Sequence, residues 1–213
     1  RVGADVNKVR AGIGSDSRIG YSYIYPGIGY GGSCFPKDVK ALIKTAELNN
    51  IEPYIINAVE KVNKRQRSLF VERVLNHFSL QGKLLDTLKL AVWGLSFKPE
   101  TDDMREAPCL TIIPELQAKG IQISVFDPQA MDEAKEYYFK DLDINYTTNK
   151  YDALDDADAM LLLTEWKEFR SPDFAELKSR MNSPVIFDGR NQYNNDMLES
   201  LGFDYYQIGV KKT

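Results

Sequence analysis

Apolar residues recur at helical intervals at the start of the chain, at Val6, Val9 and Ile13. We expect a short helix here that is broken by Gly12 and Gly14. Residues 20–32 are rich in Gly and Tyr, which predicts an extended and tightly turned loop. The first part of the chain is therefore expected to hold helices on either side of an irregular segment.

A second helix is predicted after this loop, with Asp38 as its N-cap and an apolar face at Val39, Leu42, Ile43 and Ala46. Residues 52–78 then form one long helical run that opens at Pro53 and contains no Gly. At 1.5 Å per residue, about 26 residues would span roughly 39 Å. A helix of this length with apolar residues on several sides favours a domain connection or a subunit interface, with a plain core helix as the alternative.

Beyond residue 88 the pattern changes to short apolar runs that alternate with helical ones. The predicted strands are Leu88–Leu95, Gln122–Asp127, Asp158–Thr164, Val185–Asp188 and Tyr205–Ile208. The predicted helices between them are Ala107–Lys119, Gln129–Phe139, Phe174–Met181 and Asn194–Leu201. This alternation predicts an α/β fold with a doubly wound, Rossmann-like parallel sheet. We therefore expect a helical domain over residues 1–84 and an α/β domain over residues 85–213.

Composition narrows the function classes. The 213 residues carry a formal net charge of −4, which argues against a nucleic-acid partner. The basic run over residues 61–67 is interpreted as a solvated helix face. No stretch approaches the roughly 20 apolar residues that span a membrane. Two cysteines in unlike contexts do not suggest a disulfide framework, so a reducing cytoplasm is expected.

Cys34 is the first candidate for chemistry, because it closes the glycine-rich segment at residues 27–34 just before a helix. The positive end of that helix and the neighbouring Lys37 favour a nucleophilic thiolate. Asp38 lies about one helical turn further on and could act as a base on the same site. A small buried hydrophobe is the alternative for Cys34, and it is the interpretation that we prefer for Cys109.

Charged residues after the predicted strands form a second group of candidates. The turn at residues 94–105 lacks the glycines of a dinucleotide site, but Lys98 and Arg105 could hold phosphates unless they only form surface ion pairs. Asp127 could bind a ribose hydroxyl or cap a turn, and Arg190 could meet a phosphate or form a structural ion pair. His77 is interpreted as structural. No spacing suggests a metal site.

A series of short motifs in this chain resembles the UDP-glucose 6-dehydrogenases, in the order in which that family carries them. The motifs are Gly3-Ala4-Asp5, Gly12-Ile13-Gly14, Arg18-Ile19-Gly20, Gly31-Gly32-Ser33-Cys34-Phe35-Pro36-Lys37-Asp38, Gly94-Leu95-Ser96-Phe97-Lys98, Arg105-Glu106, Thr164-Glu165-Trp166 and Phe187-Asp188-Gly189-Arg190. The resemblance covers essentially the whole chain and corresponds to the family's central helical domain and its UDP-binding domain.

The resemblance implies an NAD-dependent oxidation of UDP-glucose to UDP-glucuronate in two hydride transfers, with two NAD consumed per turnover. Cys34 would form a thiohemiacetal and then a thioester, and water assisted by Asp38 would hydrolyse the thioester. The implied substrate contacts are Tyr23, Ile24, Tyr25, Pro26, Gly27, Gly31, Phe97, Lys98 and Arg190, with Arg18 reaching the substrate of a neighbouring subunit. The implied NAD contacts are Cys34, Phe35, Pro36, Lys37 and Arg105.

The family's N-terminal NAD-binding domain has no counterpart in these 213 residues, nor do the catalytic Lys and Asn that the family carries just upstream. We therefore expect this chain alone to be inactive, and to form a homodimer or a higher homo-oligomer through the long helix. The alternatives are a GDP-mannose 6-dehydrogenase, which shares the Cys loop, and a non-catalytic module for dimerisation and nucleotide-sugar binding. The UDP-N-acetylhexosamine branch typically has His where this chain has Ser33.

Overall fold

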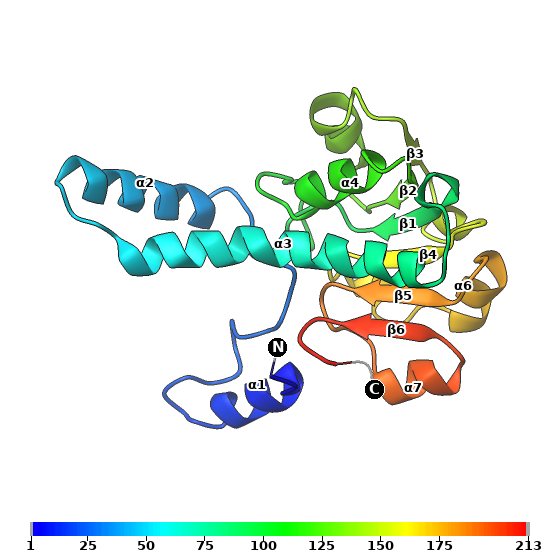
Figure 1. Cartoon of the computed structure of the whole chain (residues 1–213), viewed down its shortest axis with the longest axis horizontal. Coiled ribbons are helices and arrows are strands. Elements are labelled where there is room, and N and C mark those ends of the chain that lie inside the picture. Colours follow the sequence, from blue (N-terminus) through cyan, green and yellow to red (C-terminus); the bar gives the residue numbers. More distant parts are fainter. Residues whose placement is uncertain (1, 212–213) are drawn as a thin grey trace.

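The computed structural model describes residues 2–211, which form a helical arm and an α/β unit (Figure 1). The arm consists of α2 (Phe35–Leu48) and the first half of α3 (Tyr54–Leu80). The helix α1 (Val6–Gly14) lies apart from it, near the C-terminal end of the chain, where the Val6 N–H donates to the Gly209 carbonyl at 3.0 Å. The Asp5 carboxylate caps α1 by accepting the Asn7 N–H at 2.8 Å. The prediction that Gly12 breaks this helix was wrong, because a single glycine lowers helix stability by only about 1 kcal/mol.

The second helix begins earlier than predicted. α2 begins at Phe35, so that Cys34 is its N-cap residue and Pro36 lies in the first turn, where proline is tolerated. Asp38 already donates a helical backbone hydrogen bond to the Cys34 carbonyl at 2.9 Å. The prediction of Asp38 as the N-cap was therefore wrong.

The long helix α3 was predicted correctly, and its two halves differ in burial. Its second half buries Phe70, Val71, Val74 and Phe78 against the sheet. Its first half lies alongside α2 and leaves Ile55, Val59 and Val62 exposed. A single continuous helix therefore joins the arm to the α/β unit.

Six parallel strands form the sheet in the order β3-β2-β1-β4-β5-β6. They are β1 (Lys89–Trp93), β2 (Gln122–Phe126), β3 (Ile144–Tyr146), β4 (Ala159–Leu162), β5 (Val185–Asp188) and β6 (Asp204–Gln207). The five predicted strands are confirmed. The sequence did not reveal β3, because it is a three-residue edge strand with no buried residue to create a pattern.

Helices cover both faces of the sheet, which confirms the doubly wound fold. The covering helices are α4 (Cys109–Gln117), α5 (Met131–Glu133), α6 (Phe174–Arg180) and α7 (Asn195–Ser200), and a π-helical turn over Ala134–Tyr138 continues α5. A hydrophobic core lies on each face of the sheet, and successive residues of a strand point alternately into one core and the other. In β1, Leu90 and Val92 pack with α3 and α4, whereas Ala91 and Trp93 pack on the side of α6 and α7.

Candidate active site

The candidate site lies at the carboxyl edge of the sheet, where β1 separates the two directions in which the sheet is wound. Ligands of open α/β sheets bind at this position. The loops that leave β1, β4 and β5 meet here: Thr164 Oγ1 donates to the Ser96 carbonyl at 2.6 Å, and Arg190 Nη2 donates to the Phe97 carbonyl at 3.1 Å. The three loops therefore form one continuous rim.

The glycine-rich loop before Cys34 is pressed against this rim. The Gly32 N–H donates to the Arg105 carbonyl at 2.8 Å. A Cβ built on Gly31 would lie 2.3 Å from the Glu106 carbonyl oxygen, and one on Gly32 would lie 2.7 Å from the Phe97 ring. The close approach therefore requires glycine at both positions. It brings four of the predicted site residues, Gly31, Cys34, Phe97 and Arg105, into one area.

The Cys34 side chain is exposed at the N-terminus of α2, with its Sγ 3.7 Å from Ser33 Oγ. Its burial as a small hydrophobe is therefore excluded. Cys109 is buried and donates its thiol to the Leu95 carbonyl at 2.9 Å, as predicted, and burial raises the pKa of this thiol. Of the two cysteines, only Cys34 is open to a reactant.

Charges surround the Cys34 position. Arg105 Nη2 lies 2.8 Å from Asp103 Oδ2, and this hydrogen-bonded pairing holds the pKa of Asp103 below its usual value. A hydrogen bond from Ser33 lowers the pKa of Asp103 further. Asp38 is exposed, and its closest ion pair is with the adjacent Lys37 at 3.4 Å. Arg105 is thus held beside the cysteine loop by a carboxylate that the loop also contacts.

Arg190 joins three segments of the rim. Its Nε donates to the Leu163 carbonyl at 2.9 Å and lies 2.9 Å from Glu165 Oε2, so the structural ion pair anticipated for Arg190 is present. Its Nη1 would lie 3.2 Å from a Cβ on Gly27. Both residues border a cavity of about 690 Å³, together with Tyr25 and one side of α3.

Two buried carboxylates hold the rim loops in place. Asp127 accepts the N–H groups of Leu95 and Ser96 at 2.7 and 3.1 Å through one oxygen, and caps the turn at residues 129–130 through the other. The turn-capping role that we considered for Asp127 is thus observed, and no face of it is open to a ribose. Asp188 accepts the Arg190 N–H at 2.8 Å and the Tyr205 hydroxyl at 2.6 Å, while burial raises the pKa of Asp188.

Several predicted site residues lie outside this cluster. Arg18 is exposed and pairs with Asp16 at 2.6 Å, and Tyr23 is fully exposed with a φ of 63°. Tyr25 packs under the Arg10 guanidinium at 3.8 Å. Ile24 and Pro26 are half-buried in the same segment. Phe35 follows Cys34 and is exposed, and Lys98 lies at the rim, with its ammonium 5.3 Å from the Phe97 ring.

The basic run on α3 was only partly a solvated face. Lys61, Lys64 and Arg65 are exposed as predicted, but Arg67 is only 8% exposed. Its guanidinium donates to the carbonyl oxygens of Tyr30 and Glu106, at 2.7 and 2.8 Å. The prediction was wrong for Arg67, because a single buried position within a charged run gives no signal of its own in the sequence.

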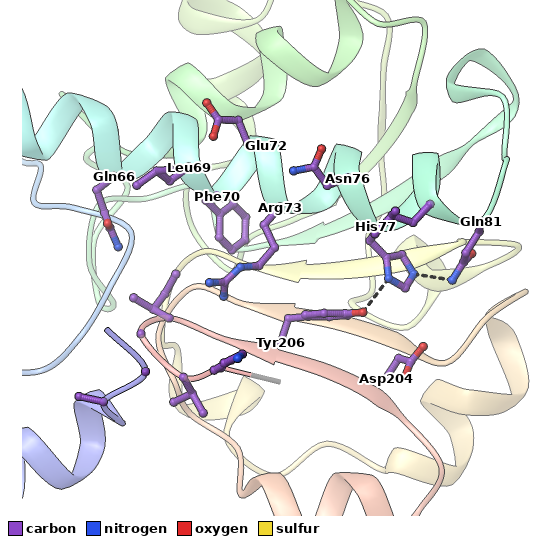
Figure 2. Close-up of a pocket in the computed structure, with 17 residues that line it drawn as sticks. Gln66, Leu69, Phe70, Glu72, Arg73, Asn76, His77, Gln81, Asp204 and Tyr206 are labelled. Atoms are coloured by element: carbon purple, nitrogen blue, oxygen red, sulfur yellow. Dashed lines mark hydrogen bonds between the residues drawn. The ribbon is translucent and has the colours of Figure 1, made fainter. Parts of the chain in front are cut away.

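A second cavity, of about 810 Å³, lies away from this cluster, between the second half of α3 and β6 (Figure 2). His77 points into it from α3, with Nδ1 2.8 Å from the Tyr206 hydroxyl and Nε2 3.1 Å from Gln81 Nε2. The His77 ring also packs edge-on against Phe187. None of the residues predicted for the active site lines this cavity.

Within residues 2–211, no three His, Cys, Asp or Glu side chains gather in a way that could hold a metal ion. The helices over the same residues include none with the length and apolar character needed to cross a bilayer.

The turn after β1 provides no glycine cradle for the pyrophosphate of a dinucleotide, and both oxygens of Asp127 already accept hydrogen bonds from protein N–H groups. The described residues therefore do not fit the main binding site of a nicotinamide dinucleotide.

Comparison with known protein families gives two matches from one family. Residues 1–65 match the central domain of the UDP-glucose/GDP-mannose dehydrogenase family, and residues 91–195 match its UDP-binding domain. The chain is 43% identical over 212 residues to a UDP-glucose 6-dehydrogenase of Pseudomonas aeruginosa and 41% identical over 210 residues to UDP-glucose 6-dehydrogenase TuaD of Bacillus subtilis. These alignments cover 97% and 98% of the chain but only 46% and 44% of the relatives.

Solved structures agree with this relationship. A UDP-glucose dehydrogenase from Pyrobaculum islandicum superposes with a TM-score of 0.80 at 29% identity, over 100% of this chain and 45% of that one. An NDP-N-acetyl-D-galactosaminuronic acid dehydrogenase from Methanosarcina mazei gives 0.83 at 26% identity, over 98% and 45%. The chain thus spans about half the length of the relatives that it matches. On the strength of both domain matches and the shared fold, the chain belongs to the UDP-glucose/GDP-mannose dehydrogenase family.

Proposed function

We propose that this chain supplies the nucleophile and the nucleotide-binding half of an NAD-dependent UDP-glucose 6-dehydrogenase. The observation that carries this proposal is the position of Cys34, exposed at a helix N-terminus and held by a glycine-rich loop against Phe97 and Arg105. The positive end of a helix and a neighbouring guanidinium both attract negative charge on a nucleophile. Cys34 is therefore equipped for covalent catalysis.

The proposed step at Cys34 is the capture of the C6 aldehyde of the oxidised sugar. The thiolate forms a C–S bond to the carbonyl carbon, the π electrons move to the oxygen, and that oxygen takes up a proton to give a thiohemiacetal. Asp38 lies one helical turn from Cys34 and is exposed, so it can accept a proton from the water that later hydrolyses the thioester. The two oxidations require a nicotinamide dinucleotide as hydride acceptor, whose main binding site the described residues do not form.

The proposed substrate is UDP-glucose, which carries a diphosphate that needs cationic partners. Lys98 and Arg190 flank Phe97 at the rim and can meet this charge. Residues 23–27 and Gly31 would complete the substrate contacts, and Arg18, which is exposed and paired with Asp16, would reach a neighbouring subunit's substrate. Phe35, Pro36, Lys37 and Arg105 would face the dinucleotide. The names of the similar sequences favour UDP-glucose over GDP-mannose.

The decisive experiment uses the longer chain that carries this segment. We expect it to form NADH with UDP-glucose, and we expect Cys34→Ser to stop turnover at the aldehyde stage. Preferred turnover of GDP-mannose, or full activity of the Ser variant, would overturn the proposal. Cys109→Ser is the matched control, because Cys109 is buried and closed to a reactant, and a Ser hydroxyl can still donate to the Leu95 carbonyl.

A binding experiment on the 213-residue chain tests the nucleotide-binding half alone. We expect calorimetry to show weak UDP-glucose binding that Lys98→Ala reduces, and no oxidation of the sugar. No binding at millimolar ligand would leave the chain with an assembly role only. The role as a non-catalytic assembly module is supported by the absence of a dinucleotide cradle among the described residues.

A further inference from the structure

One face of α3 carries three polar side chains that contact the backbone of the cysteine loop. Asn63, Gln66 and Arg67 are spaced by three and four residues, so they share one side of the helix. Each makes a hydrogen bond to a main-chain group at least 33 positions away in the sequence. Main-chain contacts of this kind fix where a loop lies without regard to its side chains.

Asn63 holds both polar groups of Tyr30. Its Oδ1 accepts the Tyr30 N–H at 2.9 Å, and its Nδ2 donates to the Tyr30 carbonyl at 3.2 Å. Gln66 Nε2 donates to the Gly27 carbonyl at 2.9 Å. A Cβ on Gly29 would lie 2.5 Å from Asn63 Oδ1, so this contact also requires a glycine in the loop. Together the two amides fix the loop from Gly27 to Tyr30.

Arg67 joins this loop to the segment after β1. One terminal nitrogen, Nη2, donates both to the Tyr30 carbonyl and to the Glu106 carbonyl, and Gly31 lies against the same Glu106 carbonyl. Glu106 has a φ of 55°, a backbone conformation that is strained for a non-glycine residue and persists only when its surroundings hold it. Its carboxylate pairs with Lys40 of α2. Arg67 therefore sits where α2, α3 and the β1 rim are connected.

We propose that Arg67, assisted by Asn63, is a positioning residue for the Cys34 thiol. By holding the carbonyls of Tyr30 and Glu106 it sets the path of the Gly31–Ser33 segment, and with it the start of α2 beside Arg105. The inference rests on the proposed function of Cys34 as the nucleophile. A buried cation is costly unless its donors are satisfied. The guanidinium of Arg67 carries several donors in a fixed fork, so it can satisfy both carbonyls from one buried position.

Hydrogen exchange on this chain tests the loop anchor directly. In Arg67→Met we expect the Tyr30 and Gly32 amides to exchange about tenfold faster or more, because a charge-assisted hydrogen bond is lost. Exchange at Val92 and Leu161 in the sheet should not change. Arg65→Met is the matched control, since Arg65 is an exposed neighbour, and it should behave as the wild type. Unchanged loop exchange, or an equal rise in the sheet, would overturn the anchor.

Conservative variants keep the test informative if Arg67→Met does not fold. Arg67→Lys retains an ammonium that can donate to both carbonyls, so it should recover part of the protection. Asn63→Ala removes the two bonds to Tyr30 without stranding a charge, and it should speed exchange at Tyr30. Wild-type protection in Asn63→Ala would contradict the proposal.

The ratio of acid to aldehyde formed by the longer chain then tests whether the contacts of Arg67 with the loop position the Cys34 thiol. A misplaced thiol should capture less aldehyde, so Arg67→Met should lower the ratio of acid to aldehyde about tenfold while the KM for UDP-glucose changes by less than about threefold. Partial unfolding would reduce both products equally and leave the ratio unchanged. An unchanged ratio with faster loop exchange would overturn the positioning role but not the proposed function. A wild-type chain that forms neither product would instead refute the proposed function, and the exchange data would still decide whether the loop is anchored.

Discussion

At the scale of single residues, the site depends on positions where a side chain has no room. Gly31 and Gly32 let the backbone of the cysteine loop lie directly on Glu106 and Phe97. The sequence indicated a close backbone approach, since glycines cluster there, but it could not show what the loop approaches. That information lies in contacts between segments more than 60 residues apart.

Gly31→Ala tests this close contact. Its Cβ would lie 2.3 Å from the Glu106 carbonyl oxygen, so we expect a loss of roughly 1–3 kcal/mol in the free energy of unfolding through overpacking. Gly12→Ala is the matched control: nothing lies within 4 Å of its Cβ, and in a helix it should stabilise by about 0.5–1 kcal/mol. Urea titration of both variants measures the difference, and equal effects would show that the loop can move away from the rim.

The pairing of Asp103 with Arg105 gives a prediction about pH. The folded state lowers the pKa of Asp103, so this carboxylate contributes stability that is present above its unfolded pKa of about 3.9 and is lost as the pH falls through the lowered value. In Arg105→Met we expect the pKa of Asp103 to rise toward its usual value, as followed by carboxyl NMR. Arg18→Met should shift Asp16 only, because that exposed pair is separate. An Asp103 titration that is unaffected by Arg105→Met would contradict this assignment.

At the scale of elements, the sequence predicted those that bury a regular stripe. The strands β1, β4 and β5 are nearly continuous apolar runs, and the second half of α3 repeats its apolar residues at helical intervals. The wrong predictions concern elements whose sequence pattern is too short to recognise or fits two positions equally well. The edge strand β3 is too short for a pattern, and Asp38 would suit an N-cap as well as the first turn that it occupies.

The second half of α3 should contribute more to stability than its length suggests, because it covers one face of the sheet. Phe78 is fully buried there, so Phe78→Ala should cost about 3–5 kcal/mol of unfolding free energy. Leu80 lies two residues further on and is exposed, and Leu80→Ala should stay within about 0.5 kcal/mol. Chemical denaturation of the two variants compares them. A small effect at Phe78 would mean that α3 is not an integral part of this core.

At the scale of the whole molecule, the two regions are stabilised differently. The α/β unit has one hydrophobic core on each face of its sheet. The helical arm has few buried side chains of its own, and its apolar residues are exposed on α2 and the first half of α3. Exposed apolar residues gathered on one arm favour a partner surface, and the length of α3 with its several apolar sides predicted one from the sequence.

We expect that partner to be a second copy of this chain. Ile55, Val59 and Val62 form a stripe at helical spacing, and Ile55 and Val62 are 80% and 65% exposed. Val62→Lys should weaken self-association at least about tenfold, since it places a charge within an apolar contact. Leu84→Lys is the matched control, because Leu84 is also an exposed apolar residue but lies beyond the other end of α3. Sedimentation equilibrium distinguishes the outcomes, and a dimer that only Val62→Lys dissociates would place the interface on the arm. Equal effects of both variants would place the interface elsewhere, and a monomeric wild type would contradict self-association of this chain.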